Sequence, residues 1–417
     1  MIITDKAQIK IAELMESNNL RLSGSDELEC YELIESDLKL PADATFTRSS
    51  VAYLSDGRQV PANTPRFEPG KFGKAIMVEE GTENIHHEKL YRDLSASYLK
   101  VTDVERDGFT RCKRFERIAE GNAYFTVDIP CLPNTAYTLT FWIRGVNLSP
   151  DSYVNMYLSD NTQSSEYHSI YGLTDEFKKF TVTRITSESA TKIVRASLHF
   201  GYNNIKVGEI IEVADWQLEA KPYATSFTDS IRSPETLTIP TAGVLNPQEG
   251  TVECWVKVPI VTNWNNFFRM DGLSNGRFLL YFTTDGRAAF DYGPSNTGPV
   301  APAGTIEANN WYYIALRWSA TTGKQALFIN GVKYEKDLPN GVATSFPSTV
   351  SVVNNYSAYI DDLRISNRAR TDEEILAAYQ SGKPLPVDEW TTYKLDFDDK
   401  VRITTQGQII CNELIEI

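Results

Sequence analysis

Apolar and polar residues alternate most regularly between Trp311 and Tyr334. One face of an extended segment would carry Tyr312, Ile314, Leu316 and Trp318, and the other face Tyr313, Ala315 and Arg317. This period of two is the pattern of a half-buried β-strand. A second strand at 326–329 runs into Asn330-Gly331. Because only residues that tolerate positive φ angles fit a type I′ turn, the chain should fold back there as a hairpin.

The same alternation recurs along most of the chain and predicts an all-β protein. Extended segments are expected at 51–55, 58–60, 75–78, 122–130, 135–145, 177–185, 195–201, 210–218, 278–284, 287–292, 357–370 and within the tail at 390–417. In the segment at 135–145, one face would carry Tyr137, Leu139, Phe141 and Ile143. The dipeptides Asp56-Gly57 and Asp285-Gly286 mark hairpin turns between neighbouring segments.

Two short helices interrupt the β pattern. The first is predicted at Thr4–Ser17, where the apolar residues would form one stripe. The second follows the segment at 357–370, because Thr371 and Glu374 have the spacing of a capping box and Gly382 stands where a C′ glycine belongs.

Composition agrees with this interpretation and excludes some functions. A chain of 417 residues is expected to fold as about two to four domains. An aromatic share of 11%, with 24 Gly and 19 Pro, favours short strands and turns over helical bundles. The net charge of −14 gives no electrostatic case for binding nucleic acid or an anionic membrane surface. No apolar run approaches the ~18 residues of a transmembrane helix. The first residues lack the pattern of a signal peptide, so we expect synthesis in a cytoplasm and no membrane insertion.

Several phrases resemble laminin-G-like, concanavalin A-type jelly rolls. They are WYYIALRW with the hairpin after it, GKFGKA at 70–75 and YIDDLRISNRAR at 359–370. The strand of E-x-W-V type that should follow GKFGKA closely appears only at 253–256. The resemblance therefore implies a discontinuous jelly roll over 44–84 and 231–383. In it, the segments near 75 and near 237 would be neighbouring strands of one sheet.

Residues 85–230 are identified as a domain inserted into that jelly roll. Its strands and its closing phrase, WQLE followed by KPYATSF at 216–227, resemble carbohydrate-binding-type β-sandwiches. Such an insertion costs little, because loop-closure entropy grows slowly with length. The predicted fold is thus two jelly-roll β-sandwiches, one inserted into the other. An N-terminal attachment arm at 1–43 and a C-terminal β extension at 384–417 complete the chain.

No pattern of catalytic residues is present. Enzymes that cut β-glucans on this kind of sandwich use an E-x-D-x-x-E strand, whose alternation puts the carboxylates on one face, and the motif is absent. The 4 histidines lack H-E-x-x-H spacing, and the 5 cysteines lack C-x-x-C spacing. Cys254 lies in an apolar stretch, where it should act as a small hydrophobe. We therefore predict that the protein is not an enzyme.

Aromatic residues beside expected loops are the candidates for saccharide contacts, because the C–H faces of sugars stack on ring faces. In the outer jelly roll these are Trp264, Phe267 and Tyr292, with Phe268 as a further option. In the insert they are Tyr153 and Tyr171, with Tyr157, Tyr167 and Tyr202 as further options. The alternative is that these rings fill the core or cover a sheet.

Calcium is the candidate ion, since sandwiches of this family often hold it through oxygen ligands, although no cofactor is required. Asp361 and Asp362 are the first candidates for ligands. Asp271 and Asp291 are weaker ones. The alternative is that one carboxylate of the first pair bonds backbone or an arginine such as Arg364 or Arg368, while the other is solvated.

The resemblance also implies a role in a particle. FTRSSVAY at 46–53, together with PRFEPGKFGKAIMVEEGT at 65–82, is similar to phrases in bacteriophage structural proteins. We therefore expect a tail, baseplate or neck appendage located in the virion. Its partners would be other virion proteins and host cell-surface polysaccharide, and its assembly a homo-oligomer such as a trimer. The alternatives are a spacer that binds no saccharide, a bacterial surface lectin and a polysaccharide depolymerase.

Overall fold

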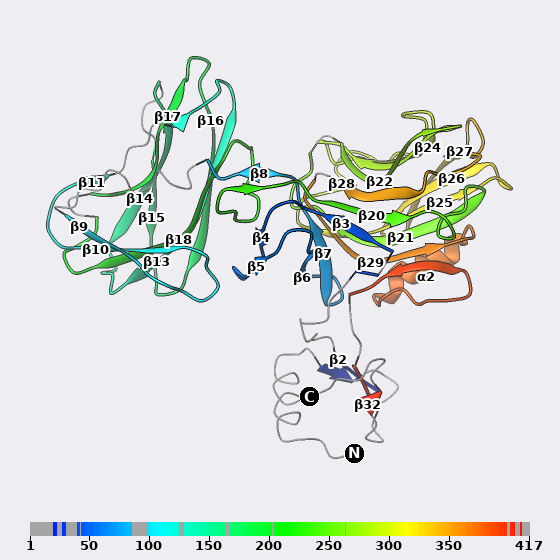
Figure 1. The fold of residues 1–417 in the computed structure, drawn as a ribbon, viewed down its shortest axis with the longest axis horizontal. Helices are drawn as coiled ribbons and strands as arrows, with labels where there is room; N and C mark the ends of the chain where they lie inside the picture. Colours follow the sequence, from blue (N-terminus) through cyan, green and yellow to red (C-terminus); the bar gives the residue numbers. More distant parts are fainter. Residues whose placement is uncertain are drawn as a thin grey trace. The chain divides into compact units, whose positions relative to one another are not determined.

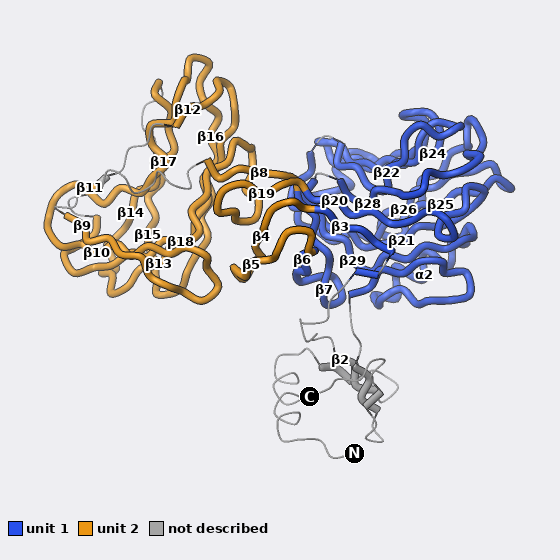
Figure 2. The backbone as a smooth tube through the Cα atoms, in the orientation of Figure 1, with its two compact units in different colours: residues 1–47, 65–79, 235–417 blue, residues 48–64, 80–234 orange. Residues whose placement is uncertain are grey.

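The computed structural model describes most of the chain. The described residues are 20–22, 27–30, 40–41, 43–85, 98–124, 129–162, 167–201, 204–262, 264–354, 356–397, 401–404 and 409–410. They form two compact units, of which unit 1 comprises 1–47, 65–79 and 235–417, and unit 2 comprises 48–64 and 80–234 (Figure 2). Apart from one helix, the regular elements of the described residues are strands, which confirms the predicted all-β class.

Unit 1 is built from two large sheets (Figure 1). The six-stranded sheet has the order β24 (Ala288–Gly293), β23 (Gly276–Phe282), β22 (Asn265–Leu273), β28 (Thr349–Asn354), β20 (Thr236–Pro240) and β3 (Thr45–Thr47). The eight-stranded sheet has the order β27 (Val332–Asp337), β26 (Lys324–Ile329), β25 (Trp311–Ser319), β21 (Glu249–Lys257), β29 (Ala358–Ser366), β7 (Lys74–Val78) and β6 (Arg66–Pro69), with β30 (Thr391–Leu395) also paired to β29. All of the pairings are antiparallel.

The core of unit 1 lies between these two sheets. The core side of β25 carries Ile314, Leu316 and Trp318, and its other side carries Tyr313 and Ala315. Trp318 packs edge-on against Phe278 of the opposite sheet, with 5.1 Å between ring centroids. The other side of β25 packs with Ile375 of the helix α2 (Asp372–Ser381). The period-two prediction is therefore confirmed for both faces of this strand.

The predicted turn and the predicted helix caps are present. Asn330 and Gly331 have φ angles of 50° and 80°, as a type I′ turn requires, and they join β26 to β27. Before α2, the Thr371 hydroxyl accepts from the backbone N–H of Glu374 at 3.2 Å, and the Glu374 carboxylate accepts from the backbone N–H of Thr371 at 2.8 Å. Gly382 ends the helix with φ 59°. These local predictions are confirmed.

The expected pairing of the segments near 75 and near 237 was wrong. Strand β7 pairs with β6 and β29 in the eight-stranded sheet, whereas β20 pairs with β3 and β28 in the six-stranded sheet. Ile76 and Leu237 enter the same core from the two different sheets. Alternation determines which face of a strand is buried, but it carries no information about which sheet supplies the partner.

The chain leaves unit 1 after Glu79 and returns at Glu235, whereas the sequence placed these points at 84/85 and 230/231. The Glu235 backbone N–H donates to the Glu79 carbonyl at 2.9 Å, and the Glu79 backbone N–H donates to the Glu235 carboxylate at 2.7 Å. Arg66 of β6 contacts both carboxylates, and all three side chains are buried. A buried ion network thus holds the exit and the return side by side.

The Asp56-Gly57 hairpin forms as predicted, with β4 (Ala52–Tyr53) paired to β5 (Gln59–Val60), but it groups with unit 2 and not with the outer jelly roll. Tyr53 contacts Phe227, with ring centroids 5.4 Å apart. The Ser50 hydroxyl accepts from the backbone N–H of Ser233 at 2.9 Å. These tertiary contacts assign the hairpin to unit 2, and no local pattern could have shown them.

Unit 2 is a second sandwich of two five-stranded sheets. One has the order β16 (Lys178–Ile185), β13 (Ala136–Val146), β18 (Ile210–Glu219), β10 (Cys112–Arg117) and β9 (Leu99–Asp103). The other has the order β11 (Ala123–Tyr124), β17 (Lys192–Phe200), β14 (Tyr153–Asp160) and β15 (Tyr167–Tyr171), with β12 (Ile129–Pro130) also paired to β17. Two short ladders, β4–β5 and β8 (Thr82–Glu83) with β19 (Ile231–Arg232), complete the unit. The core face predicted for 135–145 is confirmed, since Tyr137, Leu139, Phe141 and Ile143 all belong to the unit 2 core.

Both ends of the chain contribute to one small sheet. Its order is β1 (Leu20–Leu22), β2 (Glu27–Cys30), β31 (Val401–Thr404) and β32 (Ile409–Ile410). Strand β2 pairs antiparallel with β31, so residues from the N-terminal arm and the C-terminal extension share a sheet. The helix predicted at Thr4–Ser17 lies outside the described residues.

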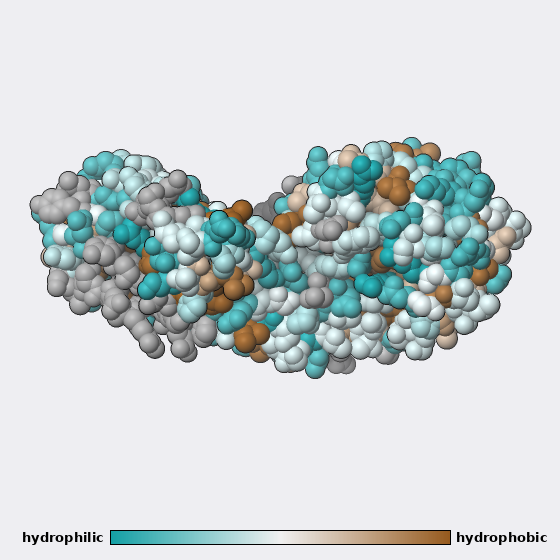
Figure 3. Space-filling view, turned by 90° about the horizontal axis from the view of Figure 1, so that it is seen from above, coloured by the Kyte–Doolittle hydropathy of each residue, from teal (hydrophilic) through white to brown (hydrophobic). Residues whose placement is uncertain are grey.

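The surface is mainly polar. Figure 3 shows small, separated hydrophobic areas on a largely hydrophilic face of the molecule. In the described part of the chain, no helix has the length and apolarity needed to cross a membrane.

Candidate functional site

The outer face of the β17–β14–β15 sheet in unit 2 combines aromatic and polar side chains. Along β14 the residues alternate, with Val154, Met156 and Leu158 in the core. We call the opposite side the tyrosine face, and it comprises Tyr153, Asn155, Tyr157 and Ser159 of β14, Tyr167, Ser169 and Tyr171 of β15, and Arg195, Ser197 and His199 of β17. Successive residues of a strand point to opposite faces, so burying the apolar set places this polar and aromatic set outside.

The register pairs the tyrosines across the β14–β15 ladder. Tyr153 lies opposite Tyr171, and their rings stack with centroids 4.7 Å apart. Tyr157 lies opposite Tyr167, with centroids 5.4 Å apart. Tyr171 and Tyr167 are 62% and 55% exposed, whereas Tyr157 is 8% exposed. Directly opposite side chains in an antiparallel ladder are close enough for such contacts. The face therefore offers two aromatic surfaces, about 13 Å apart along the strands.

A row of polar groups lies between the two tyrosine pairs. The Ser169 hydroxyl donates to Asn155 Oδ1 at 2.8 Å, and Asn155 lies opposite His199 on its other side. Tyr157 Oη and His199 Nδ1 are 3.5 Å apart. Burial, with a smaller effect from the Arg195 charge, lowers the pKa of His199, so the imidazole is neutral near pH 7. The row thus supplies an amide, a hydroxyl and a neutral imidazole.

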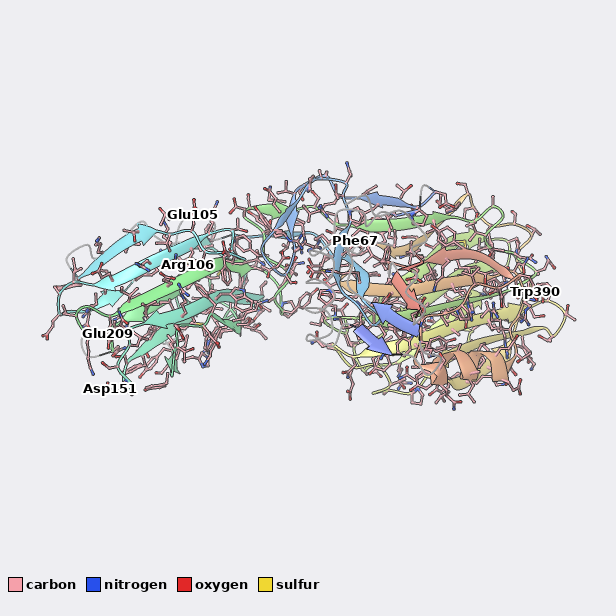
Figure 4. The ribbon with its side chains drawn as sticks, turned by 90° about the horizontal axis from the view of Figure 1, so that it is seen from below. Phe67, Glu105, Arg106, Asp151, Glu209 and Trp390 are labelled. Carbon is pink, nitrogen blue, oxygen red and sulfur yellow. The ribbon has the colours of Figure 1, made fainter. Side chains whose placement is uncertain are left out.

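The loop that starts β14 is held by Glu209. Its carboxylate accepts from the backbone N–H groups of Ser149 and Lys206 and from the Ser152 hydroxyl, each at 2.7 Å. Burial raises the pKa of Glu209, but these hydrogen bonds outweigh it and the pKa is lowered. Figure 4 shows Glu209 and Asp151 at the same end of unit 2. An ionised carboxylate therefore fixes the segment that leads into Tyr153.

The tyrosine face suits binding better than catalysis. Exposed ring faces stack on the C–H faces of sugars, and the half-buried Ser169 hydroxyl can bond a hydroxyl group. None of the residues that define the face carries a carboxylate, so it lacks the pair of acids that glycoside hydrolysis uses.

The structure separates the aromatic residues that the sequence suggested. Tyr153 and Tyr171, far apart in sequence, come together as a stacked pair. Trp264 of unit 1 is 40% exposed and stacks on Tyr281, with centroids 4.8 Å apart. Phe267 and Tyr292 are fully buried, so the expectation of accessible rings was wrong for both. Their strands, β22 and β24, direct these rings into the core of unit 1.

Two of the further aromatic candidates do not offer an accessible ring that the structure describes. Phe268 is also buried in unit 1, and Tyr202 lies outside the described residues. Asn155, Ser169, Arg195 and His199 were not identified from the sequence. The alternation along 153–160, 167–171 and 192–200 would have put each on an outer face, but only the register brings these faces together.

The two calcium candidates bond different parts of unit 1. Asp361 Oδ2 accepts from the backbone N–H groups of Lys71 and Phe72 at 2.6 and 3.0 Å. Asp362 accepts from the backbone N–H of Leu385 at 2.5 Å and pairs with Lys394. An ammonium group on one carboxylate and two N–H groups on the other do not fit a shared calcium ion. The alternative is confirmed in that the carboxylates bond backbone N–H groups, but both are buried, so the expectation that one of them is solvated was wrong. The cation beside Asp362 is a lysine rather than an arginine.

The weaker calcium candidates have partners of their own. Asp291 pairs with Arg277 and accepts from the backbone N–H groups of Asn296 and Gly298, both at 2.9 Å. Asp271 forms an exposed ion pair with Arg269 at 2.6 Å. Within the described residues, no group of three or more His, Cys, Asp or Glu side chains could hold a metal ion.

The stability of unit 1 is expected to fall as the pH rises through about 6, because of Asp361. Burial raises the pKa of this carboxyl to about 6 from an ordinary value of 3.8, although the N–H groups of Phe72 and Lys71 oppose the shift. Asp396 raises the pKa further and Lys394 lowers it. The folded state therefore holds a proton that the unfolded chain has lost. The resulting stability, about 2–3 kcal/mol, is complete below pH 3.8 and disappears above about 6.

Asp361→Asn should remove this pH dependence. Urea unfolding of the variant and the wild type, from pH 4 to pH 7.5, measures the difference between the two stability curves. Burial also raises the pKa of Asp215 in unit 2 to about 6. Because both proteins keep Asp215, its contribution to the pH dependence cancels when their stability curves are compared. Parallel curves for the two proteins would contradict the assignment to Asp361.

One family model matches part of the chain. Residues 233–376 match the model described as the concanavalin A-like lectin/glucanases superfamily. This part of unit 1 contains the central hairpin and the YIDDLRIS strand, so the concanavalin A-type resemblance is confirmed for it. No curated protein matches the chain.

Solved structures with similar arrangements share little sequence with the chain. A heptameric SAP-like pentraxin from Limulus polyphemus has 16% identity, covers 40% of this chain and 80% of its own, and gives a TM-score of 0.30. Mouse laminin alpha1 domains LG4-5 have 11% identity, cover 65% and 96%, and give a TM-score of 0.23. A CBM22-1–CBM22-2 tandem domain from Paenibacillus barcinonensis has 8% identity, covers 70% and 98%, and gives a TM-score of 0.25. Likenesses at this level carry no argument about what the chain binds.

Proposed function

We propose that the protein binds saccharides on the tyrosine face of unit 2 without transforming them. The observation that carries this proposal is the stacked pair of Tyr153 and Tyr171 beside the second pair, Tyr157 and Tyr167. The half-buried Ser169 lies between the pairs and can bond a sugar hydroxyl. The absence of acidic residues from this face supports binding rather than hydrolysis.

The wider role that we propose is that of a structural protein in a bacteriophage or phage-like particle. It would be a tail, baseplate or neck appendage that presents its sandwiches to polysaccharide on the host cell surface. The support is the similarity of the phrases at 46–53 and 65–82 to those of phage structural proteins. Its partners would be other virion proteins and further copies of the chain, with a trimer as the first assembly to test.

Removing one exposed ring is expected to weaken saccharide binding about two- to tenfold, since an aromatic contact contributes about 0.5–1.5 kcal/mol. Tyr171→Ala and Tyr167→Ala are the test variants, because both rings are more than half exposed. The measurement is titration calorimetry of the full chain with purified host wall polysaccharide, after a glycan array has selected the class of ligand.

Trp390→Ala is the matched control, because Trp390 of unit 1 is 41% exposed and lies outside the tyrosine face. A calcium chelator should leave binding unchanged. If the wild type binds neither cells nor polysaccharide under any condition, the proposal fails and the spacer alternative gains support. Release of reducing ends from the polysaccharide would instead identify a depolymerase.

A further inference from the structure

Arg195 is the one charged residue of the tyrosine face. It lies on β17 opposite Ser159, in the row next to Tyr157 and Tyr167. Its guanidinium carbon is 5.1 Å from the centroid of the Tyr157 ring, and the side chain is half-buried. The arginine is therefore held against the aromatic surface by a cation–π contact, and no described residue accepts a hydrogen bond from its N–H groups.

Arg195 has no anionic partner among the described residues. In the same unit Arg58, Arg106, Arg111, Arg114 and Arg144 each form an ion pair with a carboxylate. The acid next to Ser159 is Asp160, but it is buried and accepts hydrogen bonds from Thr162 and from the backbone N–H of Ser187. A half-buried guanidinium without a carboxylate is a site that a ligand can complete.

We infer that the tyrosine face selects saccharides that carry a negative charge, and that Arg195 recognises the anionic group. The inference rests on the proposed function and names its ligand class: sugars bearing a carboxylate, as in uronic acids, or a phosphate. The planar fork of a guanidinium matches both groups with two parallel hydrogen bonds. A sugar ring stacked on Tyr167, which is 55% exposed, would place its substituents next to the row that Arg195 occupies.

The net charge of the protein does not prevent this selection. The formal charge of −14 is spread over the whole chain, and at physiological ionic strength charges beyond about 8 Å are screened. His199 is neutral near pH 7, because burial and the Arg195 charge lower its pKa, so among the residues that define the face only Arg195 carries a full charge. At contact distance the face is therefore positive.

The test compares three ligands on the full-length protein by titration calorimetry. They are a galacturonate oligomer, a neutral xylan oligomer of the same length and a glycerol-phosphate polymer. The wild type should bind one of the two anionic ligands at least tenfold more tightly than the neutral one. Arg195→Gln should weaken binding of that ligand about 10- to 100-fold, as expected for a charge-assisted hydrogen bond, and should weaken binding of the neutral ligand far less. Arg195→Lys should bind this ligand more tightly than Arg195→Gln but less tightly than the wild type, because lysine keeps the charge but lacks the planar guanidinium that forms two parallel hydrogen bonds.

The anionic ligand that responds identifies the source of the charge as carboxylate or phosphate. Equal loss of neutral and anionic binding in Arg195→Gln would overturn the inference, because the arginine would then only support the Tyr157 ring. The same conclusion follows if the wild type binds neutral and anionic ligands equally well. Titrating the wild type at higher salt concentration tests the inference without a variant, since only binding of the anionic ligands should weaken. If no ligand of either charge binds, it is the proposed function that fails.

Discussion

Replacing Arg66 with alanine is expected to destabilise unit 1 by about 3–5 kcal/mol, because it leaves two buried carboxylates without their cation. Arg66 Nη2 lies 2.8 Å from Glu79 and 2.9 Å from Glu235, and the side-chain exposures are 0%, 2% and 0%. Burial alone would lower the Arg66 pKa, but the two glutamates outweigh it and raise the pKa. The guanidinium is therefore always charged, and its loss forces two like charges together at low dielectric.

The position of this network makes the loss larger than that of one contact. The Glu235 carboxylate also accepts from the backbone N–H of Glu79, so a shift of either glutamate disturbs the ladder between the exit and return segments. Scanning calorimetry and urea unfolding measure the change. Arg269→Ala is the control, because it removes an exposed ion pair with Asp271 and should have little effect. Equal changes in the two variants would show that burial of the Arg66 network does not stabilise the fold.

The second large effect is expected at Glu253, near the middle of β21. Its carboxylate accepts from Arg364 Nε and Nη2 at 2.9 and 2.8 Å and from the Tyr313 hydroxyl at 2.6 Å, and it lies 3.3 Å from Arg370 Nε. All four residues are buried. Glu253→Ala leaves one hydroxyl and two guanidinium groups without this acceptor, so we expect a loss of about 3–5 kcal/mol.

Replacing the partners of Glu253 is expected to give a graded series of stability losses. Tyr313→Phe removes one hydrogen bond to the carboxylate and should cost about 1–3 kcal/mol. Burial, followed by the Glu253 charge, raises the pKa of Tyr313, so this hydroxyl stays protonated and donates at any ordinary pH. Arg370 keeps an ion pair with Asp388 at 2.8 Å, whereas Arg364 keeps only the Pro386 carbonyl at 2.7 Å.

A double-mutant cycle between Glu253→Ala and Arg364→Ala, followed by urea unfolding, measures the interaction energy between these two residues. We expect a coupling energy of more than 1 kcal/mol, because removing either partner leaves the other buried without its counter-ion. Additive effects of the two substitutions would mean that each residue acts through separate contacts.

The candidate site was only partly predictable from the sequence. Tyr153 and Tyr171 were identified as separate aromatic residues, and their pairing depends on the β14–β15 register. Phe267 and Tyr292 were expected beside loops but lie in the core, because the sequence does not show which face of β22 and β24 meets the opposite sheet. Arg195 acquired its significance only when the structure placed it against Tyr157 without a carboxylate.

The sequence by itself determined the local features of this protein. Alternation of apolar residues set the β class and the buried face of β25, and Asn330-Gly331 set the hairpin turn, because each depends on φ angles and side-chain directions within a few residues. The tertiary structure decided which strands became partners. It put β7 and β20 in different sheets and aligned two tyrosine pairs on one face of unit 2. Strand pairing is settled by packing between segments that are distant in sequence, and the pattern within a single strand fits many partners equally well.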